Sequence, residues 1–217
     1  MFKGLLEKFL DLIYKKRCVI CSCSKANDLL CKTCSKDIIF LSTFPHRIYN
    51  SITIYSATVY TSVIKKLIQL FKFQHKRNIS KVLADLLFQY FKKLNLNNKY
   101  IVIYPNSFYF KNMTRGYEHM YLIAKEFCKL SDFKLLKNAI CKTKNTIPQY
   151  KAKNRFKNVS GVFKINKKYI KELKENPILL IDDIITSGAT IEEIINILNK
   201  EKIKNITVLT ISKAVKS

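Results

Sequence analysis

The chain has 217 residues, of which 48% are hydrophobic, enough for one good-sized domain or for a domain with a small added module. It carries 40 Lys and Arg residues against 15 Asp and Glu residues, a net charge of +25. The hydrophobic content excludes a disordered chain, and basic residues along the whole sequence exclude a separate charged tail. The charge favours a polyanionic partner, either nucleic acid or an acidic membrane surface; a general bias toward Lys is the alternative.

The first segment, residues 2–13, has apolar side chains at helical spacing interrupted by Lys3, Glu7, Lys8 and Asp11. These charges exclude a signal-peptide core and a membrane span. We predict an amphipathic helix that packs on its own domain, with docking on a membrane surface as the alternative. We therefore expect a cytoplasmic protein, with any membrane contact peripheral and at the inner face of the cytoplasmic membrane.

Two C-x2-C motifs follow, and nine residues separate them. They are formed by Cys18 and Cys21 and by Cys31 and Cys34. Two residues between thiolates allow a tight turn that points both sulfurs at one metal, and two such turns complete a four-sulfur zinc site. Cys23 is left outside this set, because pairing it in place of Cys21 leaves a poorer spacing. The alternative is a group of buried or reactive free thiols.

The remaining cysteines and the histidines give no metal signal. Cys128 and Cys141 stand alone and are expected to be ordinary core or surface residues. His46, His75 and His119 have no partner at ligand spacing, so we assign them no metal.

From residue 51 onward, segments with strand character alternate with segments that have helical periodicity. In chain order the pattern predicts a strand at 51–60, helices at 63–72 and 79–94, a strand at 100–104, a helix at 120–130, a strand at 178–181, a helix at 191–200 and a strand at 206–211. The Lys- and Asn-rich stretch 142–157 is predicted to be an exposed loop. This order implies an α/β fold with a parallel sheet and right-handed crossovers. We place the domain boundary near Pro45, which separates a module at 1–45 from a domain at 46–217.

The segment from Ile178 to Glu193 has the features of a phosphate-binding loop. A buried strand ends in Asp182 and Asp183, and a turn of small residues leads into a helix. Ligands of open α/β sheets bind beyond the carboxyl ends of the strands, where backbone N–H groups and a helix N-terminus attract phosphate. The two acids can accept hydrogen bonds from ribose hydroxyls. The candidate ligand-binding residues are Asp182, Asp183, Thr186, Ser187, Gly188, Ala189 and Thr190.

A structural explanation competes with this interpretation. Thr190 and Glu193 match a capping box, which exists in helices that bind nothing. A capping box does not explain two adjacent acids at the end of a buried strand, since acids there are unfavourable without a partner. We therefore predict a ribose 5-phosphate site.

At these residues the sequence resembles the type I phosphoribosyltransferases, whose phosphoribosyl pyrophosphate signature is an apolar strand, two acids and T-T/S-G-x-T. Further residues resemble the ComF family of bacterial competence proteins over nearly the whole chain. They are the early cysteines, the Arg115-Gly116-Tyr117 motif, Thr146, Gln149, Arg155, Asn158, Gly161 and Phe163. The chain departs from that family at Glu118-His119, where N-Q is typical, and at Gln74-His75 after Lys72-Phe73, where K-F-H is often followed by Gly.

The resemblance implies a type I phosphoribosyltransferase-like domain behind a zinc ribbon, with structural zinc and with Mg²⁺ accompanying phosphoribosyl pyrophosphate. It also implies a role in DNA uptake, in which the protein handles single-stranded DNA together with other proteins of the competence machinery. By the same resemblance, the candidates for contact with the pyrophosphate are Pro105, Asn106, Ser107 and Arg115. The loop with Lys144, Gln149, Lys151 and Arg155 would correspond to a basic flap that closes over the substrate.

Three functions remain open at this point. The chain is a competence protein that holds a nucleotide, phosphoribosyl pyrophosphate or a DNA end; or an active phosphoribosyltransferase of the amidophosphoribosyltransferase kind; or an assembly adaptor with a relic pocket. The surplus of positive charge favours the DNA function, because a metabolic transferase needs only a basic pocket. No catalytic residue and no acceptor site is assigned.

The aromatic residues from Tyr104 to Tyr117 have two interpretations. They are either stacking surfaces for bases or part of the core.

Overall fold

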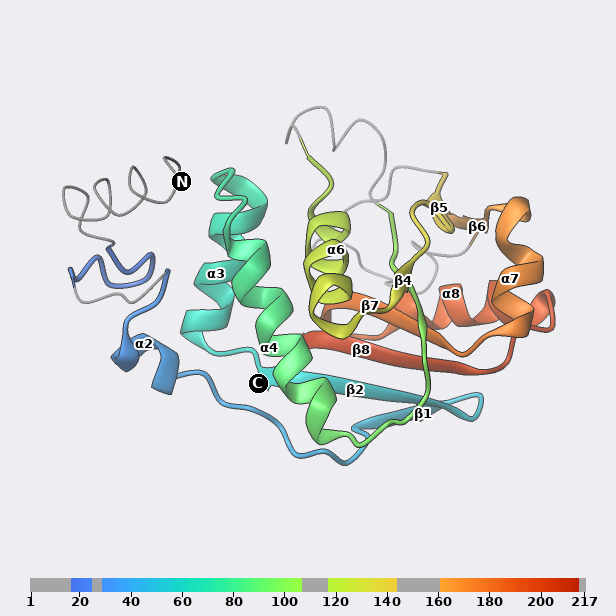
Figure 1. The fold of residues 1–217 in the computed structure, drawn as a ribbon, viewed down its shortest axis with the longest axis horizontal. Coiled ribbons are helices and arrows are strands. Elements are labelled where there is room, and N and C mark those ends of the chain that lie inside the picture. The colour runs from blue at the N-terminus through green and yellow to red at the C-terminus, as the bar shows by residue number, and fades with distance from the viewer. Residues whose placement is uncertain (1–16, 25–28, 107–116, 144–160, 215–217) are drawn as a thin grey trace, which may run out of the picture.

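The computed structural model describes residues 17–24, 29–106, 117–143 and 161–214, which form an α/β fold around one six-stranded sheet (Figure 1). The strand order is β1-β2-β8-β7-β3-β4, and β5 and β6 form a separate two-stranded hairpin. Predictions for residues 2–13, for Ser107 and Arg115, and for the basic flap lie outside the described residues. Among the described residues, no helix is both long and apolar enough to cross a membrane.

The strands are β1 (Arg47–Tyr49), β2 (Ile52–Val59), β3 (Ile101–Ile103), β4 (Lys134–Leu135), β5 (Ile140–Lys142), β6 (Phe163–Ile165), β7 (Ile178–Ile185) and β8 (Ile206–Lys213). The helices are α2 (Lys32–Lys36), α3 (Ser62–Phe73), α4 (Ile79–Lys93), α6 (His119–Ser131), α7 (Ile170–Glu175) and α8 (Ala189–Lys200), with a short 3-10 turn at Lys167–Tyr169. Each predicted strand and helix is confirmed within a few residues, except that β7 continues four residues beyond its predicted end.

The sheet is mostly parallel, as predicted. β2, β8, β7, β3 and β4 pair in parallel, and their carboxyl ends therefore share one edge of the sheet. The outer strand β1, which is not among the predicted strands, is antiparallel to β2. A three-residue strand beside a tight turn has too few residues to show a periodicity, which is why the sequence pattern does not reveal it.

Helices cover both faces of the sheet, as Figure 1 shows for α3, α4 and α6 on one side and α7 and α8 on the other. The side chains of the central strand β7 alternate between the two faces of the sheet, so helices are needed on both faces to bury them. Leu179 and Ile181 pack with α3, α4 and α6, whereas Ile178 and Leu180 pack with α8. A strand buried on both faces reads as a continuous apolar run rather than an alternating one.

The cysteine-rich module packs against the helical face of the main domain. Val19, Ile20, Leu29 and Leu30 contact its core, and the Lys66 ammonium of α3 donates a hydrogen bond to the Ile20 carbonyl at 2.6 Å. The segment that follows the module runs antiparallel to β2, with a bridge between Phe40 and Thr58. The cysteine-rich segment is therefore held against the core by apolar contacts as well as by the chain.

Candidate functional sites

The predicted phosphate loop lies between β7 and α8, at the carboxyl edge of the sheet. β7 carries both acids and continues to Ile185, because its pairing with β8 extends to Lys213. The turn at 186–188 then leads directly into α8, whose first residue is Ala189. Gly188 has φ of +87°, a left-handed conformation that side chains with a Cβ rarely adopt. A glycine at this position therefore permits the sharp turn from strand to helix.

The capping-box explanation for Thr190 and Glu193 is wrong. Gly188 occupies the N-cap position of α8, so Thr190 lies inside the first turn and not at the cap. Glu193 instead accepts a hydrogen bond from the Gly161 backbone N–H at 2.7 Å. Of the first N–H groups of α8, that of Ala189 donates a hydrogen bond to the Ser187 hydroxyl at 3.4 Å. A helix N-terminus whose N-cap residue is a glycine is a place where backbone N–H groups can attract an anion.

Asp183 lies on the face of β7 that is covered by α3 and α6. Its carboxylate forms an ion pair with the Lys72 ammonium at the end of α3, and the His119 Nε2 atom lies 3.4 Å from the same oxygen. The other Asp183 oxygen accepts the Ile184 backbone N–H at 2.6 Å. The protein itself therefore supplies the partner that a buried acid requires, through two side chains that lie far from Asp183 in the sequence.

Asp182 lies in a different environment, although it is the adjacent residue. It is buried, and its carboxylate accepts the Asp183 backbone N–H at 2.8 Å. Burial and the neighbouring Asp183 carboxylate raise the pKa of Asp182 to about 7. Burial acts in the same direction on Asp183, but the Lys72 ammonium and the His119 imidazole outweigh it and hold the pKa of Asp183 below its ordinary range.

A small hollow opens beside the loop. It is lined by Asp182, Ile184, Ile185, Thr186, Gly188, Thr190 and Ile191, and its volume is about 10 Å³. This volume holds about one water molecule, so a phosphate group requires the loop to widen. Of the two acids, Asp182 lines the hollow and Asp183 does not, which makes Asp182 the acid placed to meet a ligand there.

The loop after β3 begins next to β7 near Asp182, because β3 and β7 are adjacent parallel strands and Ile103 pairs with Leu180. Pro105 forms a bridge with Ile140, and the Asn106 side-chain amide donates a hydrogen bond to the Asn138 side chain at 2.9 Å. The candidates Pro105 and Asn106 for the pyrophosphate side thus lie at the same edge of the sheet as Asp182. Tyr104 is buried in the core, so the idea that it stacks on bases is wrong for this residue.

The four predicted zinc ligands lie together. The sulfur atoms of Cys18, Cys21, Cys31 and Cys34 are all within 4.8 Å of one another, and the Cys21 and Cys31 sulfurs are 3.7 Å apart. Four sulfurs at about 2.3 Å from a tetrahedral zinc lie about 3.8 Å apart, so this arrangement fits the ion. Cys23 packs against the cluster without joining the set.

The local electrostatics of the cysteines also fit a cation. Burial raises the pKa of the Cys18 thiol, but hydrogen bonds from the Cys21, Cys31 and Ile20 backbones outweigh it and lower this pKa to about 6. Burial and the neighbouring sulfurs raise the pKa of Cys34. Four sulfurs at this distance cannot all be thiolates without a positive charge among them, and a divalent ion supplies that charge. Four cysteines that can hold a structural zinc are therefore present.

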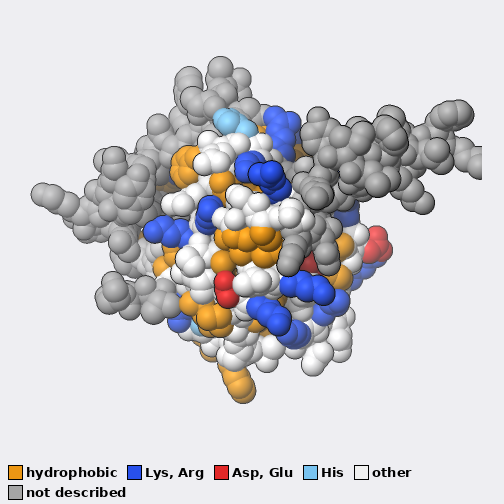
Figure 2. Space-filling view, turned by 90° about the vertical axis from the view of Figure 1, so that its left-hand side faces the viewer, with side chains coloured by type: hydrophobic (Ala, Val, Ile, Leu, Met, Phe, Trp, Pro, Cys, Tyr) orange, Lys and Arg blue, Asp and Glu red, His pale blue; other side chains and the backbone are white. Residues whose placement is uncertain are grey.

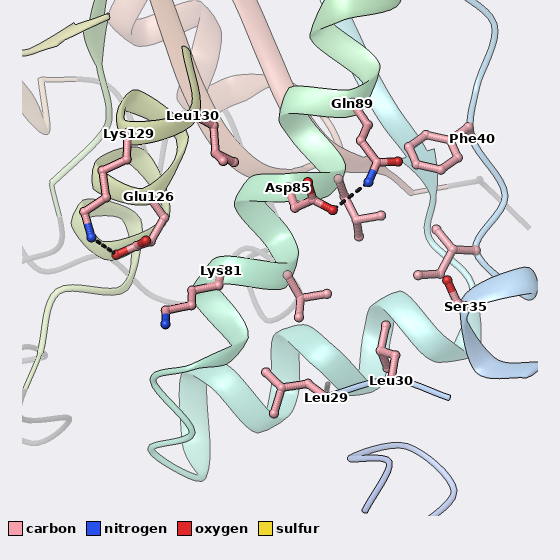
Figure 3. Close-up of a pocket in the computed structure, with 13 residues that line it drawn as sticks. Leu29, Leu30, Ser35, Phe40, Lys81, Asp85, Gln89, Glu126, Lys129 and Leu130 are labelled. Atoms are coloured by element: carbon pink, nitrogen blue, oxygen red, sulfur yellow. Dashed lines mark hydrogen bonds and ion pairs between the residues drawn. The ribbon is translucent and has the colours of Figure 1, made fainter. Parts of the chain in front are cut away.

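A larger groove lies elsewhere, between the cysteine module and helices α4 and α6 (Figure 3). Its volume is about 610 Å³, and Leu29, Leu30, Phe40 and Leu130 contribute apolar side chains to it. The charged groups at its wall are partly paired with each other, as between Lys129 and Glu126. An apolar groove with paired charges lacks the cluster of N–H donors that a sugar phosphate needs, so the phosphate loop remains the better candidate despite its smaller hollow.

These features define an α/β protein with a mostly parallel sheet, a polar loop at the carboxyl edge of that sheet and an N-terminal four-cysteine cluster. No family model matches the chain. The chain is 28% identical over 161 residues to Competence protein F of Haemophilus influenzae, a similarity that covers 71% of this chain and 70% of that protein. This relationship confirms the resemblance to the ComF family.

Proposed function

We propose that the chain is a competence protein that handles single-stranded DNA and that binds phosphoribosyl pyrophosphate, or a related sugar phosphate, in the loop at 186–190. The name of the homologue, Competence protein F, supports a role related to competence. The observation that supports this ligand is the N-terminus of α8, where Gly188 takes the N-cap position in a left-handed turn and Asp182 lines the adjacent hollow.

The roles proposed for the loop residues follow from their positions. The 5-phosphate would accept hydrogen bonds from the backbone N–H groups of residues 187–190 and from the Thr186, Ser187 and Thr190 hydroxyls. Asp182 would accept a hydrogen bond from a ribose hydroxyl. Asp183 would act mainly by fixing Lys72 and His119 beside the site. When Mg²⁺ accompanies the ligand, it would neutralise charge on the pyrophosphate, close to Pro105 and Asn106.

Thermal unfolding with and without ligand tests this proposal. At a ligand concentration of 100 times Kd, binding stabilises the native state by about 2.7 kcal/mol, which raises Tm by about 5–10 °C for a chain of this size. We expect this rise with phosphoribosyl pyrophosphate plus Mg²⁺ and with ribose 5-phosphate, and no rise with ribose. Equal Tm values for ribose and for both phosphorylated ligands would count against the site.

The proposal for single-stranded DNA is supported by the distribution of charge. Figure 2 shows Lys and Arg side chains over the described part of one face, with hydrophobic side chains between them. With a net charge of +25, the surface attracts phosphates well beyond any single site. Because binding releases counterions, we expect affinity to fall steeply with salt, with a slope of about 0.7 for each phosphate neutralised.

A salt titration of oligonucleotide binding measures this slope. Wild-type protein and Asp182→Asn should give the same slope and the same affinity at each salt concentration, since Asp182 is buried at the ligand hollow and lies outside the basic surface. Affinity that does not change between low and physiological salt, or no binding at low salt, would contradict a role in DNA handling.

A second candidate function is that of an assembly adaptor. The groove beside the cysteine module favours it, because Leu29 and Leu30 place apolar surface from the module next to α4 (Figure 3). Proteins of the competence machinery would be the partners in this case.

The transferase alternative stays open as a proposal, and a pyrophosphate-release assay with candidate acceptor bases would test it.

A further inference from the structure

Arg47 reaches the phosphate loop from the edge strand β1, although 140 residues separate it from Ser187 in the chain. Its Nη1 atom donates a hydrogen bond to the Ser187 carbonyl at 2.9 Å. Its Nη2 atom forms an ion pair with Glu192 in the first turn of α8. The Glu192 side chain is 10% exposed and the Arg47 side chain 37%, so the pair lies at the boundary between core and solvent. One planar guanidinium thus ties the loop to the helix that follows it.

The hydrogen bond to the Ser187 carbonyl fixes the orientation of the next N–H group. The peptide between Ser187 and Gly188 is trans, and in a trans peptide the C=O and N–H bonds point in opposite directions. With the carbonyl held by Arg47, the Gly188 N–H points away from the guanidinium. The hollow at the loop is lined by Gly188 and Thr190 and not by Arg47.

Gly188 and Arg47 are also fitted to each other. A Cβ atom at position 188 would lie 2.5 Å from the Arg47 Nη1 atom and 3.3 Å from a Glu192 carboxylate oxygen. Any other residue at position 188 would therefore displace the guanidinium as well as strain the backbone. Gly188 thus leaves room for the Arg47 guanidinium. The phosphate-loop motif by itself does not require an arginine at this place.

From these contacts we infer that Arg47 is a positioning residue of the phosphate loop, which turns the Gly188 N–H group toward the 5-phosphate without touching the ligand itself. This inference rests on the proposed function of the loop as a sugar-phosphate site. Glu192 holds the second arm of the guanidinium and so keeps it in the plane that the Ser187 carbonyl requires. The charge of Arg47 also offsets that of Glu192, which otherwise repels a phosphate at the helix N-terminus.

Four variants separate the positioning effect from the effect of charge. Arg47→Met removes both contacts, and Arg47→Lys keeps the charge but loses the two-armed geometry. Arg47→Met combined with Glu192→Gln restores the charge balance but leaves the Ser187 carbonyl without its donor. Lys134→Met is the matched control, since it breaks an ion pair with Glu172 at the far edge of the sheet.

The experiment measures the affinity for ribose 5-phosphate at a temperature at which circular dichroism shows every variant to be folded. We expect Arg47→Met and the double variant to bind at least tenfold more weakly than wild type, Arg47→Lys to lie between them and wild type, and Lys134→Met to be unchanged. Wild-type affinity in Arg47→Met would overturn the inference while leaving the proposed site intact. Wild-type affinity in Arg47→Lys or in the double variant would show that charge alone matters and would overturn it too. Absence of binding to the wild-type protein would overturn the proposed site and this inference together.

Discussion

Replacing both Cys31 and Cys34 by Ser is expected to abolish binding of the one zinc ion that the four cysteines can hold, and to unfold the cysteine module. Four thiolates at tetrahedral distances leave no open coordination position, so the role of the ion is structural. Structural zinc sites of this kind contribute about 10–16 kcal/mol of binding energy to folding, far more than any single contact in the chain. Elemental analysis of the purified protein should give one zinc per chain, and none in the double variant.

Single substitutions give a sharper test of the ligand set. Cys21→Ser is expected to lose zinc, whereas Cys23→Ser is expected to keep it, although only one residue separates these cysteines. Hydrogen exchange should show loss of protection at Val19 and Ile20, which pack against the main domain, while β7 stays protected. Zinc retained after Cys21→Ser, or lost after Cys23→Ser, would show that the ligand set is wrong.

Asp183→Ala is expected to destabilise the protein, because it leaves the Lys72 ammonium without its carboxylate. Breaking a buried ion pair by removing one partner costs about 3–5 kcal/mol. Since one-fifth of the Lys72 side chain reaches solvent, we expect about 3 kcal/mol, which lowers Tm by about 6–12 °C. Asp85→Ala on the exposed side of α4 serves as the control and should change Tm by no more than a few degrees.

The two neighbouring acids should respond in opposite directions. The pKa of Asp183 is held below the unfolded value of about 3.9, so its charge stabilises the fold above that pH and the contribution is lost as the pH falls toward the folded pKa. The pKa of Asp182 is raised to about 7, so its ionisation favours the unfolded state at neutral pH. At neutral pH, Asp182→Asn should therefore raise Tm and Asp183→Asn should lower it. A shift of the same sign in both variants would contradict the assigned environments.

The sequence pattern predicts the elements that position the phosphate loop, because each is long and strongly periodic. The apolar run before Asp182 and the helix after Gly188 are local signals, and so are the two C-x2-C motifs. The end of β7 and the start of α8 are less predictable. Pairing with β8 extends the strand β7 through both acids. The helix begins after the left-handed Gly188 and before Thr190, so the capping-box assignment of Thr190 is wrong.

The partners of the loop could not be predicted, because they come from distant parts of the chain. Arg47 is 140 residues from Ser187, and it lies on a strand too short to show a pattern. Lys72 and His119 meet Asp183 only once α3 and α6 have packed on the same face of the sheet. His119 did carry a signal, since it stands at one of the two positions where the chain departs from the ComF pattern that it resembles. A departure near a predicted site can thus mark a residue that contacts it.

We propose that the loop between β7 and α8 binds a sugar 5-phosphate. Isothermal titration of the purified protein with phosphoribosyl pyrophosphate, with and without Mg²⁺, tests it most directly. We predict one ligand per chain, displaced by an excess of ribose 5-phosphate and not by ribose, with affinity reduced at least tenfold when Gly188 is replaced by Ala. A titration of folded, zinc-loaded protein that shows no binding at millimolar ligand, or binding that ribose displaces as well as ribose 5-phosphate does, would contradict the account.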